Sequence, residues 1–339
     1  MDFKQFLHLE LGASQRILIT PLNWGLGHAS RCIPIIQYLL ANQKDIYLAT
    51  DGVSLSFLKN EFPDIECILM PSYGVRYPFR NMKMNMLINI LPMLLAIIRE
   101  RRTVASVVRK YYIDTIISDN RYGARFKNTR NIFIGHQLSI PVMPKWLGRF
   151  LSYLQSFWIH KFDECWVPDF PPPHNISGRM IQFSKTTNIK YMGILSRFQK
   201  LEREKVRELL VILSGPEPAR TKLEKEMGKT LRGRDYLLVR GVPGKINHVG
   251  RNNRVDMMTS EMLNEAICSS EWIICRAGYS GIMDMIITES KAIIIPTPGQ
   301  PEQEYLSQRM SVIRPKQFYS VREDRLEDIS TILDKGQVS

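Results

Sequence analysis

Two short apolar runs near the C-terminus of this 339-residue chain, residues 271–275 and 292–296, each lead directly into a turn rich in small residues. The runs have the length and composition of buried strands, and a helical pattern follows each turn. Strand, turn and helix in this order predict a parallel α/β sheet, because parallel strands need such crossover connections. The turns then lie at one edge of the sheet, where α/β proteins place their ligands.

Polar groups gather at these two turns. The first reads Cys275-Arg-Ala-Gly-Tyr-Ser-Gly281 and precedes Asp284, and the second reads Pro296-Thr-Pro-Gly-Gln-Pro-Glu-Gln303 and precedes Glu304. A helix that begins at such a turn presents backbone N–H groups to an anion. N–H groups, a carboxylate and side-chain amides at one edge suit a nucleotide diphosphate and its ribose.

These residues resemble the donor-nucleotide site of the GT-B glycosyltransferases, most closely the family 28 group that includes MurG. The resemblance implies that Gly278 and Ser280 face the donor phosphates and that Asp284 holds the ribose hydroxyls. It also implies that Gln303 and Glu304 contact the donor sugar. That group usually has Glu in place of Asp284 and a second Gln in place of Glu304, so the identity of the sugar stays open.

A further turn follows the apolar run at residues 209–214. By the same resemblance Ser214, Gly215 and Arg220 contact the donor diphosphate, and the alternative is a plain Pro-Gly turn. Arg276 would neutralise diphosphate charge together with the helix N-termini. The sequence has no Asp-x-Asp motif of the kind that metal-dependent transferases use, and we therefore expect neither a catalytic metal nor a cofactor.

A glycine loop also opens the first helix of the N-terminal half. Gly25 and Gly27 are followed by His28, but Ser30 stands at the third glycine position of a dinucleotide-binding fingerprint. In the competing dinucleotide interpretation, Asp51 would bind the ribose. The Gly-x-Gly-His form instead resembles the acceptor loop of family 28, and this implies that His28 is the general base. A helix cap or a phosphate ligand is the alternative role for His28.

Three more residues complete the expected acceptor side. Asp119 and His136 each follow an apolar run, and we expect Asp119 either to orient His28 or to replace it as the base. The alternative for Asp119 is a helix or turn cap. By resemblance His136 lines the acceptor pocket. Arg31 is expected to bind an acceptor phosphate or to be a solvated helix residue.

Residues 83–102 predict a helix with two interpretations. Residues 86–98 are almost continuously apolar and are flanked by Lys83 on one side and by Arg99, Arg101 and Arg102 on the other. The run is too short to span a bilayer, which needs about 20 residues. It suits a helix lying on an anionic membrane surface, and equally an ordinary core helix with a charged C-terminus.

Charge and cysteine usage limit the remaining classes. Residues 1–195 contain 23 Lys and Arg against 13 Asp and Glu, whereas residues 196–339 contain 23 against 20. A basic half without a nucleic-acid-binding motif favours anionic lipid or phosphorylated substrates over nucleic acid. Five cysteines without a CxxC spacing argue against a disulfide framework or a zinc site. The N-terminus lacks a signal-peptide pattern, so we expect a cytoplasmic protein, peripheral on the inner face of the membrane.

The strand and helix signals fall into two groups, separated by a linker at residues 167–198. We therefore expect an α/β protein with two Rossmann-like domains. Residues 1–195 would form the acceptor domain and residues 196–320 the nucleotide-sugar domain. The resemblance implies that the two parallel sheets face each other across a cleft. It also implies that residues 321–339 form a helix that crosses back to the first domain.

The resulting functional hypothesis is an inverting glycosyltransferase. It would move a sugar from a UDP-sugar donor to a hydroxyl group of a glycan, a lipid-linked molecule or another cell-envelope acceptor. A nucleotide-sugar 2-epimerase of the same fold and a non-catalytic nucleotide-sugar-binding protein remain as alternatives. A dehydrogenase is a more distant alternative, which NAD binding would distinguish.

Overall fold

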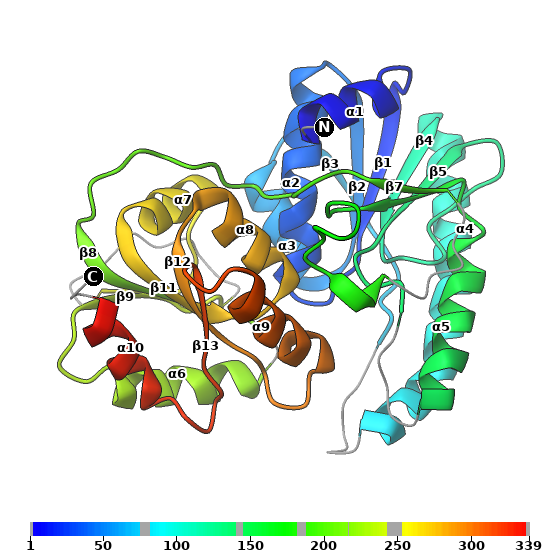
Figure 1. Cartoon of the computed structure of the whole chain (residues 1–339). Helices are drawn as coiled ribbons and strands as arrows, with labels where there is room; N and C mark the ends of the chain where they lie inside the picture. Colours follow the sequence, from blue (N-terminus) through cyan, green and yellow to red (C-terminus); the bar gives the residue numbers. More distant parts are fainter. Residues whose placement is uncertain are drawn as a thin grey trace. The chain divides into compact units, whose positions relative to one another are not determined.

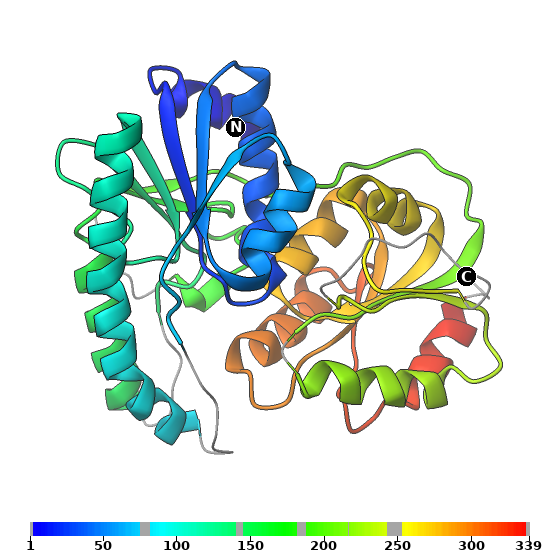
Figure 2. The same ribbon diagram turned by 180° about the vertical axis from the view of Figure 1, so that it is seen from behind.

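The computed structural model describes residues 3–74, 82–139, 145–181, 188–215, 217–242 and 253–336. The chain divides into two compact units, Met1–Leu195 and Ser196–Ser339. Each unit is a sheet of parallel strands with helices packed on it (Figure 1, and from behind in Figure 2). The predicted α/β architecture with two parallel sheets is therefore confirmed.

The first unit contains a seven-stranded sheet in the order β3-β2-β1-β4-β5-β6-β7. Its central strands are buried almost throughout because helices cover the sheet, which explains why their sequences are apolar runs without alternation. The strands are β1 (Arg16–Pro21), β2 (Asp45–Thr50), β3 (Glu66–Leu69), β4 (Thr115–Asp119), β5 (Arg130–Ile134), β6 (Glu164–Val167) and β7 (Ile189–Tyr191).

Five α-helices accompany this sheet: α1 (Phe3–Leu11), α2 (Leu26–Ala41), α3 (Gly52–Glu61), α4 (Met82–Tyr111) and α5 (Lys145–Ile159). A short 3-10 helix spans Gly178–Met180. Helix α4 is longer than the predicted helix at 83–102, because Val104, Val107 and Val108 continue its buried face against the sheet. The predicted linker at 167–198 also contributes β7, which pairs with β6 and belongs to the first unit.

The second unit contains a six-stranded sheet in the order β10-β9-β8-β11-β12-β13. Its strands are β8 (Arg207–Ile212), β9 (Tyr236–Val239), β10 (Arg254–Val255), β11 (Ser270–Arg276), β12 (Lys291–Ile295) and β13 (Phe318–Ser320). Its helices are α6 (Ala219–Thr230), α7 (Ser260–Cys268), α8 (Tyr279–Thr288), α9 (Pro301–Ile313) and α10 (Asp328–Gly336).

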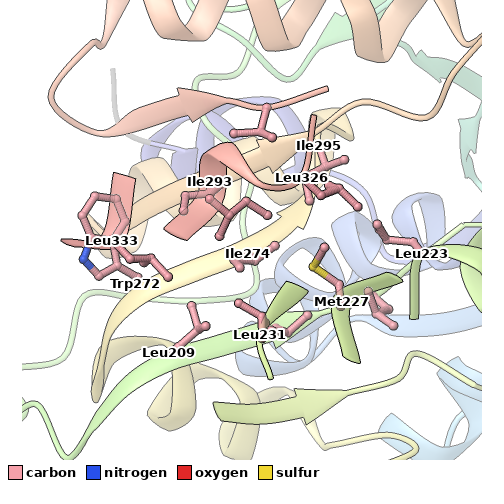
Figure 3. Close-up of a cluster of buried hydrophobic side chains, with 14 of the residues drawn as sticks. Leu209, Leu223, Met227, Leu231, Trp272, Ile274, Ile293, Ile295, Leu326 and Leu333 are labelled. Atoms are coloured by element: carbon pink, nitrogen blue, oxygen red, sulfur yellow. The ribbon is translucent and has the colours of Figure 1, made fainter. Parts of the chain in front are cut away.

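The C-terminal helix α10 differs from the expectation that residues 321–339 cross back to the first domain. Ile329 and Leu333 of α10 are fully buried in the hydrophobic core of the second unit. Figure 3 shows Leu333 beside Trp272 of β11, with Leu223 and Met227 of α6 and its C-cap residue Leu231 in the same core. Each buried Leu or Ile contributes about 1.5–3 kcal/mol, which is enough to hold this short helix on its own sheet.

Each sheet has one point where the strand order reverses. In the first sheet this point lies between β1 and β4, and in the second between β8 and β11. The connections from the two neighbouring strands leave in opposite directions there, and this is the position at which open α/β sheets bind their ligands. Most of the expected site residues follow these four strands, whereas His136 follows β5, and Gln303 and Glu304 follow β12.

Candidate functional site

The site in the first unit begins at the ends of β1 and β4. Pro21 and Asp119 are register partners, and the N–H of Leu22 donates to the Asp119 carbonyl oxygen at 3.0 Å. The chain then turns at Gly25, whose φ of 74° is in the region that favours glycine, and α2 starts at the next residue. This turn places His28 in the first helical turn, directly beside Asp119.

His28 and Asp119 form a hydrogen-bonded pair. The His28 Nδ1 atom lies 2.9 Å from Asp119 Oδ1, and the Asp119 side chain is fully buried whereas that of His28 is 14% exposed. Arg31 Nη2 also lies 2.9 Å from Nδ1, but this group already has Asp119 Oδ1 as its acceptor. A proton on Nδ1 that is donated to the carboxylate is therefore the favoured arrangement, since charge-assisted hydrogen bonds are the stronger ones. In this tautomer Nε2 carries the lone pair that a general base needs.

Arg31 is buried, so the alternative of a solvated helix residue is wrong, whereas contact with an acceptor phosphate stays a prediction. Its side chain is almost fully buried, because its guanidinium group is held by two partners inside the unit. Nε donates to Asp119 Oδ2 at 2.5 Å, Nη2 donates to Asp119 Oδ1, and Nη1 lies 2.8 Å from Nδ1 of His136. Arg31 therefore orients Asp119 and His136.

These contacts set the protonation states of the pair. Burial alone would raise the pKa of Asp119, but the charges of Arg31 and His28 hold that pKa well below its usual range. Burial lowers the pKa of His28 below 6.5; Asp119 opposes this shift and Arg31 reinforces it. His28 is therefore neutral and Asp119 ionised at neutral pH, which are the states required for a base and its orienting carboxylate.

A second buried network fixes the backbone around this pair, and sequence reasoning missed it. Arg121 is fully buried between the carboxylates of Asp51 and Glu100, and its Nε donates to the Pro21 carbonyl oxygen at 2.9 Å. Asn23 also donates to Asp51. Asp51 is thus occupied by partners of its own unit, which removes the observation that favoured a dinucleotide ribose at this position. A charged residue two positions after Asp119 was the only sequence signal.

Trp24 is the other residue that the sequence analysis did not single out. Its side chain is 50% exposed, although Leu22 before it is buried and Asn23 is held by hydrogen bonds to Asp51 and Ser54. The loop therefore holds a large aromatic side chain in solvent four residues before His28. An exposed aromatic surface next to a base suits a ligand with an apolar face.

The site in the second unit is built from two open glycine turns. Gly215 follows β8 with a φ of 107°, and Gly278 precedes α8 as its N-cap. At both positions a Cβ atom would meet nothing within 4 Å, so the space beside the backbone is open. Because the N-cap residue of α8 is a glycine, it contributes no capping side chain. Ser214 is exposed and Ser280 is partly buried, so the two turns can present backbone and hydroxyl groups to an anion.

Asp284 lies on α8 with its carboxylate partly buried. Its Oδ1 accepts a hydrogen bond of 2.5 Å from Ser196 Oγ. Burial raises the pKa of Asp284 to about 6, against the opposing effects of Arg197 and Ser196. A carboxylate with a shifted pKa beside an open glycine turn is a typical binding-site feature.

The two arginines expected at the diphosphate are both held in ion pairs within the second unit. The Arg276 side chain is 2% exposed and donates from Nη1 to Glu323 Oε2 at 2.8 Å. Arg220 is similarly buried, with Nη1 donating to Glu224 Oε2 at 2.8 Å and Nε donating to Glu217. Each guanidinium offsets the cost of burying a neighbouring carboxylate, and contact of either arginine with a donor diphosphate stays a prediction.

Gln303 and Glu304 close the loop that precedes α9. Gln303 Oε1 accepts the Thr297 N–H at 2.9 Å, and Glu304 Oε1 accepts the Gly299 N–H at 2.9 Å. Their side chains therefore shape this loop, and contact with a donor sugar stays a prediction. Within the described ranges no three His, Cys, Asp or Glu residues are grouped as metal ligands would be. Among the described helices, none is long and apolar enough to cross a membrane.

Comparison with known proteins gives the fold a name. No family model matches the chain. Two relatives, from Methanosarcina acetivorans and Methanosarcina mazei, are both named uncharacterized glycosyltransferases. They are 24% and 23% identical over 325 and 327 residues, and each alignment covers 85% of this chain and 81% of the relative.

Solved structures match at similar length. The calicheamicin glycosyltransferase CalG4 has a TM-score of 0.61 at 12% identity, covering 95% of this chain and 89% of its own. The spinosyn rhamnosyltransferase SpnG, complexed with thymidine diphosphate, has a TM-score of 0.60 at 12% identity, covering 94% and 92%. The fold is that of a GT-B glycosyltransferase. MurG of Acinetobacter baumannii is a more distant GT-B neighbour, with a TM-score of 0.52 at 11% identity over 94% and 90%, so the family 28 assignment stays a prediction.

Proposed function

We propose that this chain, which has the GT-B fold and relatives named glycosyltransferases, is an inverting glycosyltransferase that uses a UDP-sugar donor. The observation that carries the proposal is the His28–Asp119 pair at the switch point of the first sheet. Its geometry leaves Nε2 as a base, and a base of this kind is needed to activate an acceptor hydroxyl group.

The proposed reaction is a single displacement. His28 Nε2 takes the proton of the acceptor hydroxyl group while the hydroxyl oxygen forms a bond to the anomeric carbon of the donor. The bond between that carbon and the diphosphate oxygen breaks, and the nucleoside diphosphate leaves with the electron pair. The N-terminus of α8 and the backbone at Gly215 favour the negative charge of the leaving group.

The donor is proposed to bind the second unit. The open turns at Gly215 and Gly278 accommodate the diphosphate, and Asp284 accepts hydrogen bonds from the ribose hydroxyls. We propose that no essential metal takes part, because the helix N-termini supply the positive potential at the diphosphate. Full activity in the presence of EDTA is the expected result, and loss of activity that Mg²⁺ or Mn²⁺ restores would refute this part.

A thermal-shift panel tests the donor. A ligand that binds only the folded protein raises the unfolding midpoint. We expect UDP to raise it without magnesium, and the effect to be lost in Asp284→Ala. A neighbour in the structural comparison is complexed with thymidine diphosphate, so TDP belongs in the panel with GDP and NAD. Stabilisation by NAD, or by no nucleotide, would contradict the proposal.

We also propose that the acceptor is lipid-linked or belongs to the cell envelope, and that the first unit rests on the inner face of an anionic membrane. On the side of α4 that packs against the protein core, Ala96, Ile97 and Glu100 are buried, so this helix is partly a core helix. Its other face exposes apolar side chains beside exposed Arg99, Arg101 and Arg102. The exposed apolar residues of α4 and the neighbouring α5 are Leu91, Leu94, Leu95, Ile98, Tyr153 and Phe157.

An apolar helix face flanked by cations is typical of a helix in the interface of an anionic bilayer. Lys83 was also expected among these flanking cations, but its side chain is not among those that the structure describes. Sedimentation with anionic vesicles tests the proposal: the wild type should pellet, and Leu91→Gln/Leu95→Gln should remain in the supernatant. Equal sedimentation of both proteins, or equal binding to zwitterionic vesicles, would contradict it.

A further inference from the structure

The segment that connects the two units contacts the proposed ribose-binding acid. The first unit ends at Leu195, and Ser196 is the first residue of the second. Ser196 Oγ donates to Asp284 Oδ1 at 2.5 Å and accepts the N–H of Phe198 at 3.0 Å. The Ser196 hydroxyl group has one proton. Because its oxygen accepts the Phe198 N–H, that proton is donated to the Asp284 carboxylate. The orientation of the Ser196–Asp284 hydrogen bond is therefore fixed.

The two oxygens of Asp284 are in different situations. Oδ1 is held by Ser196, whereas Oδ2 makes no hydrogen bond to any residue in the described part of the chain. The side chain is partly buried, so an unused acceptor oxygen there carries a cost unless a ligand or water completes it. With Oδ1 held by Ser196, Oδ2 of Asp284 is the oxygen that could accept a hydrogen bond from a diol such as the ribose hydroxyls.

The next residue of the segment adds a charge. The Arg197 guanidinium stacks on the Phe198 ring at 4.7 Å and donates to Ser260 Oγ at 3.2 Å, which ties the segment to α7. Burial raises the pKa of Asp284 to about 6, and Arg197 and the Ser196 hydrogen bond both oppose this rise. Residues 196–198 thus keep Asp284 largely ionised at neutral pH.

We propose that Ser196 is a positioning residue of the nucleotide site, which fixes Asp284 for the ribose hydroxyls and couples nucleotide binding to the connecting segment. This inference rests on the proposed nucleotide-binding function. A ribose that engages Oδ2 favours the ionised and oriented carboxylate, and this is the state that Ser196 stabilises. Because such coupling is reciprocal, ordering of residues 196–198 and nucleotide affinity change together.

The dissociation constant of UDP, measured by calorimetry on the full chain from pH 5 to pH 8, tests the inference. Ser196→Ala should weaken UDP binding by about tenfold at pH 7, as expected for loss of a hydrogen bond to a charged group. The pH at which affinity falls should also move upward from about 6, because the lost hydrogen bond favoured the ionised form. Ser196→Thr, which keeps the hydroxyl group, should restore both values.

Ser311→Ala is the matched control, since Ser311 is partly exposed on α9 and its hydroxyl group donates within that helix, to the Gln308 carbonyl oxygen. Hydrogen exchange gives a second readout. UDP should protect the amide of Phe198 in the wild type and in Ser311→Ala, but not in Ser196→Ala or Asp284→Asn.

The possible results distinguish a failure of the Ser196 inference from a failure of the proposed nucleotide function. If the wild type binds UDP, and Ser196→Ala binds it with the same affinity and the same pH midpoint, the inference about Ser196 is refuted and the donor site stands. Protection of Phe198 that is unchanged in Ser196→Ala refutes the coupling in the same way. Absence of UDP binding by the wild type refutes the proposed nucleotide function, and the inference with it.

Discussion

The two switch points of this protein are built differently. In the first unit the polar groups satisfy one another, since Arg31 holds Asp119 and His136 while Asp119 holds His28. In the second unit the glycine turns are open and Asp284 keeps one oxygen unused among the described contacts. A closed network fixes the position and the protonation state of one group, whereas an open edge leaves room for a large anion. The first arrangement suits proton transfer and the second suits binding.

The largest effect should come from His28→Ala. Removal of a general base typically costs 10²- to 10⁴-fold, so turnover measured as UDP release should fall by about that factor while UDP affinity is unchanged. His174→Ala, an exposed histidine of the same unit, is the control. In the wild type the acid limb of the rate profile should lie below 6.5, since burial lowers the pKa of His28. Unchanged turnover in His28→Ala would show that the closed network has no role in proton transfer.

Arg276→Met tests whether Arg276 stabilises the second unit or binds the donor diphosphate. Arg276 and Glu323 form a nearly fully buried pair, and without Arg276 the buried Glu323 carboxylate would keep an ion pair with Lys222, whose side chain is mostly exposed. We expect a loss of about 3–5 kcal/mol in the free energy of unfolding of the second unit, measured by urea titration. The exposed pair of Arg322 and Asp324 provides the control, because Arg322→Met should change stability by less than about 1 kcal/mol. A stable Arg276→Met protein that has lost UDP affinity would support the diphosphate role predicted from the sequence.

Asp284→Asn should show how much the ionised Asp284 carboxylate destabilises the second unit. The folded protein raises the pKa of Asp284 from 3.8 to about 6, so the carboxyl group favours the fold below pH 3.8 and loses this contribution as pH rises through 6. At pH 8 the substitution should therefore raise the thermal midpoint in the absence of nucleotide, and at pH 4 it should not. UDP should stabilise the wild type only. A lower midpoint at pH 8 would mean that the ionised carboxylate stabilises the second unit.

The smallest effect is expected from Trp24→Ala. An exposed side chain contributes little to the fold, so the thermal midpoint should change by no more than the equivalent of about 0.5 kcal/mol. If the acceptor packs against this aromatic surface, KM for the acceptor should rise several-fold, with UDP affinity unchanged and partial rescue by Trp24→Phe. An unchanged KM for the acceptor would exclude Trp24 from the acceptor site.

The sequence predicted the fold more accurately than it predicted the partners of the charged side chains. Apolar runs such as residues 271–275 and glycine turns such as Gly278 depend on neighbouring residues, and the predicted strands and turns formed there. The pairing of Arg276 with Glu323 joins residues 47 apart, and that of Arg31 with Asp119 joins residues 88 apart. Local pattern contains no information about which carboxylate a buried arginine meets, so these roles needed the structure.

The placement of α10 was missed for a related reason. The family resemblance implied a crossing helix, but Ile329 and Leu333 find their buried surface on the sheet of their own unit. Periodicity predicts which side of a helix is apolar, whereas it does not predict which sheet covers it.

Proton NMR of the wild type with a UDP-sugar tests the central claim most directly. The account predicts release of UDP and a sugar product, transferred or hydrolysed, whose anomeric configuration is inverted relative to the donor. It also predicts that His28→Ala forms this product at about 10²- to 10⁴-fold lower rate. A product with retained configuration, conversion of the sugar to its C2 epimer, or tight UDP-sugar binding without turnover would contradict the account.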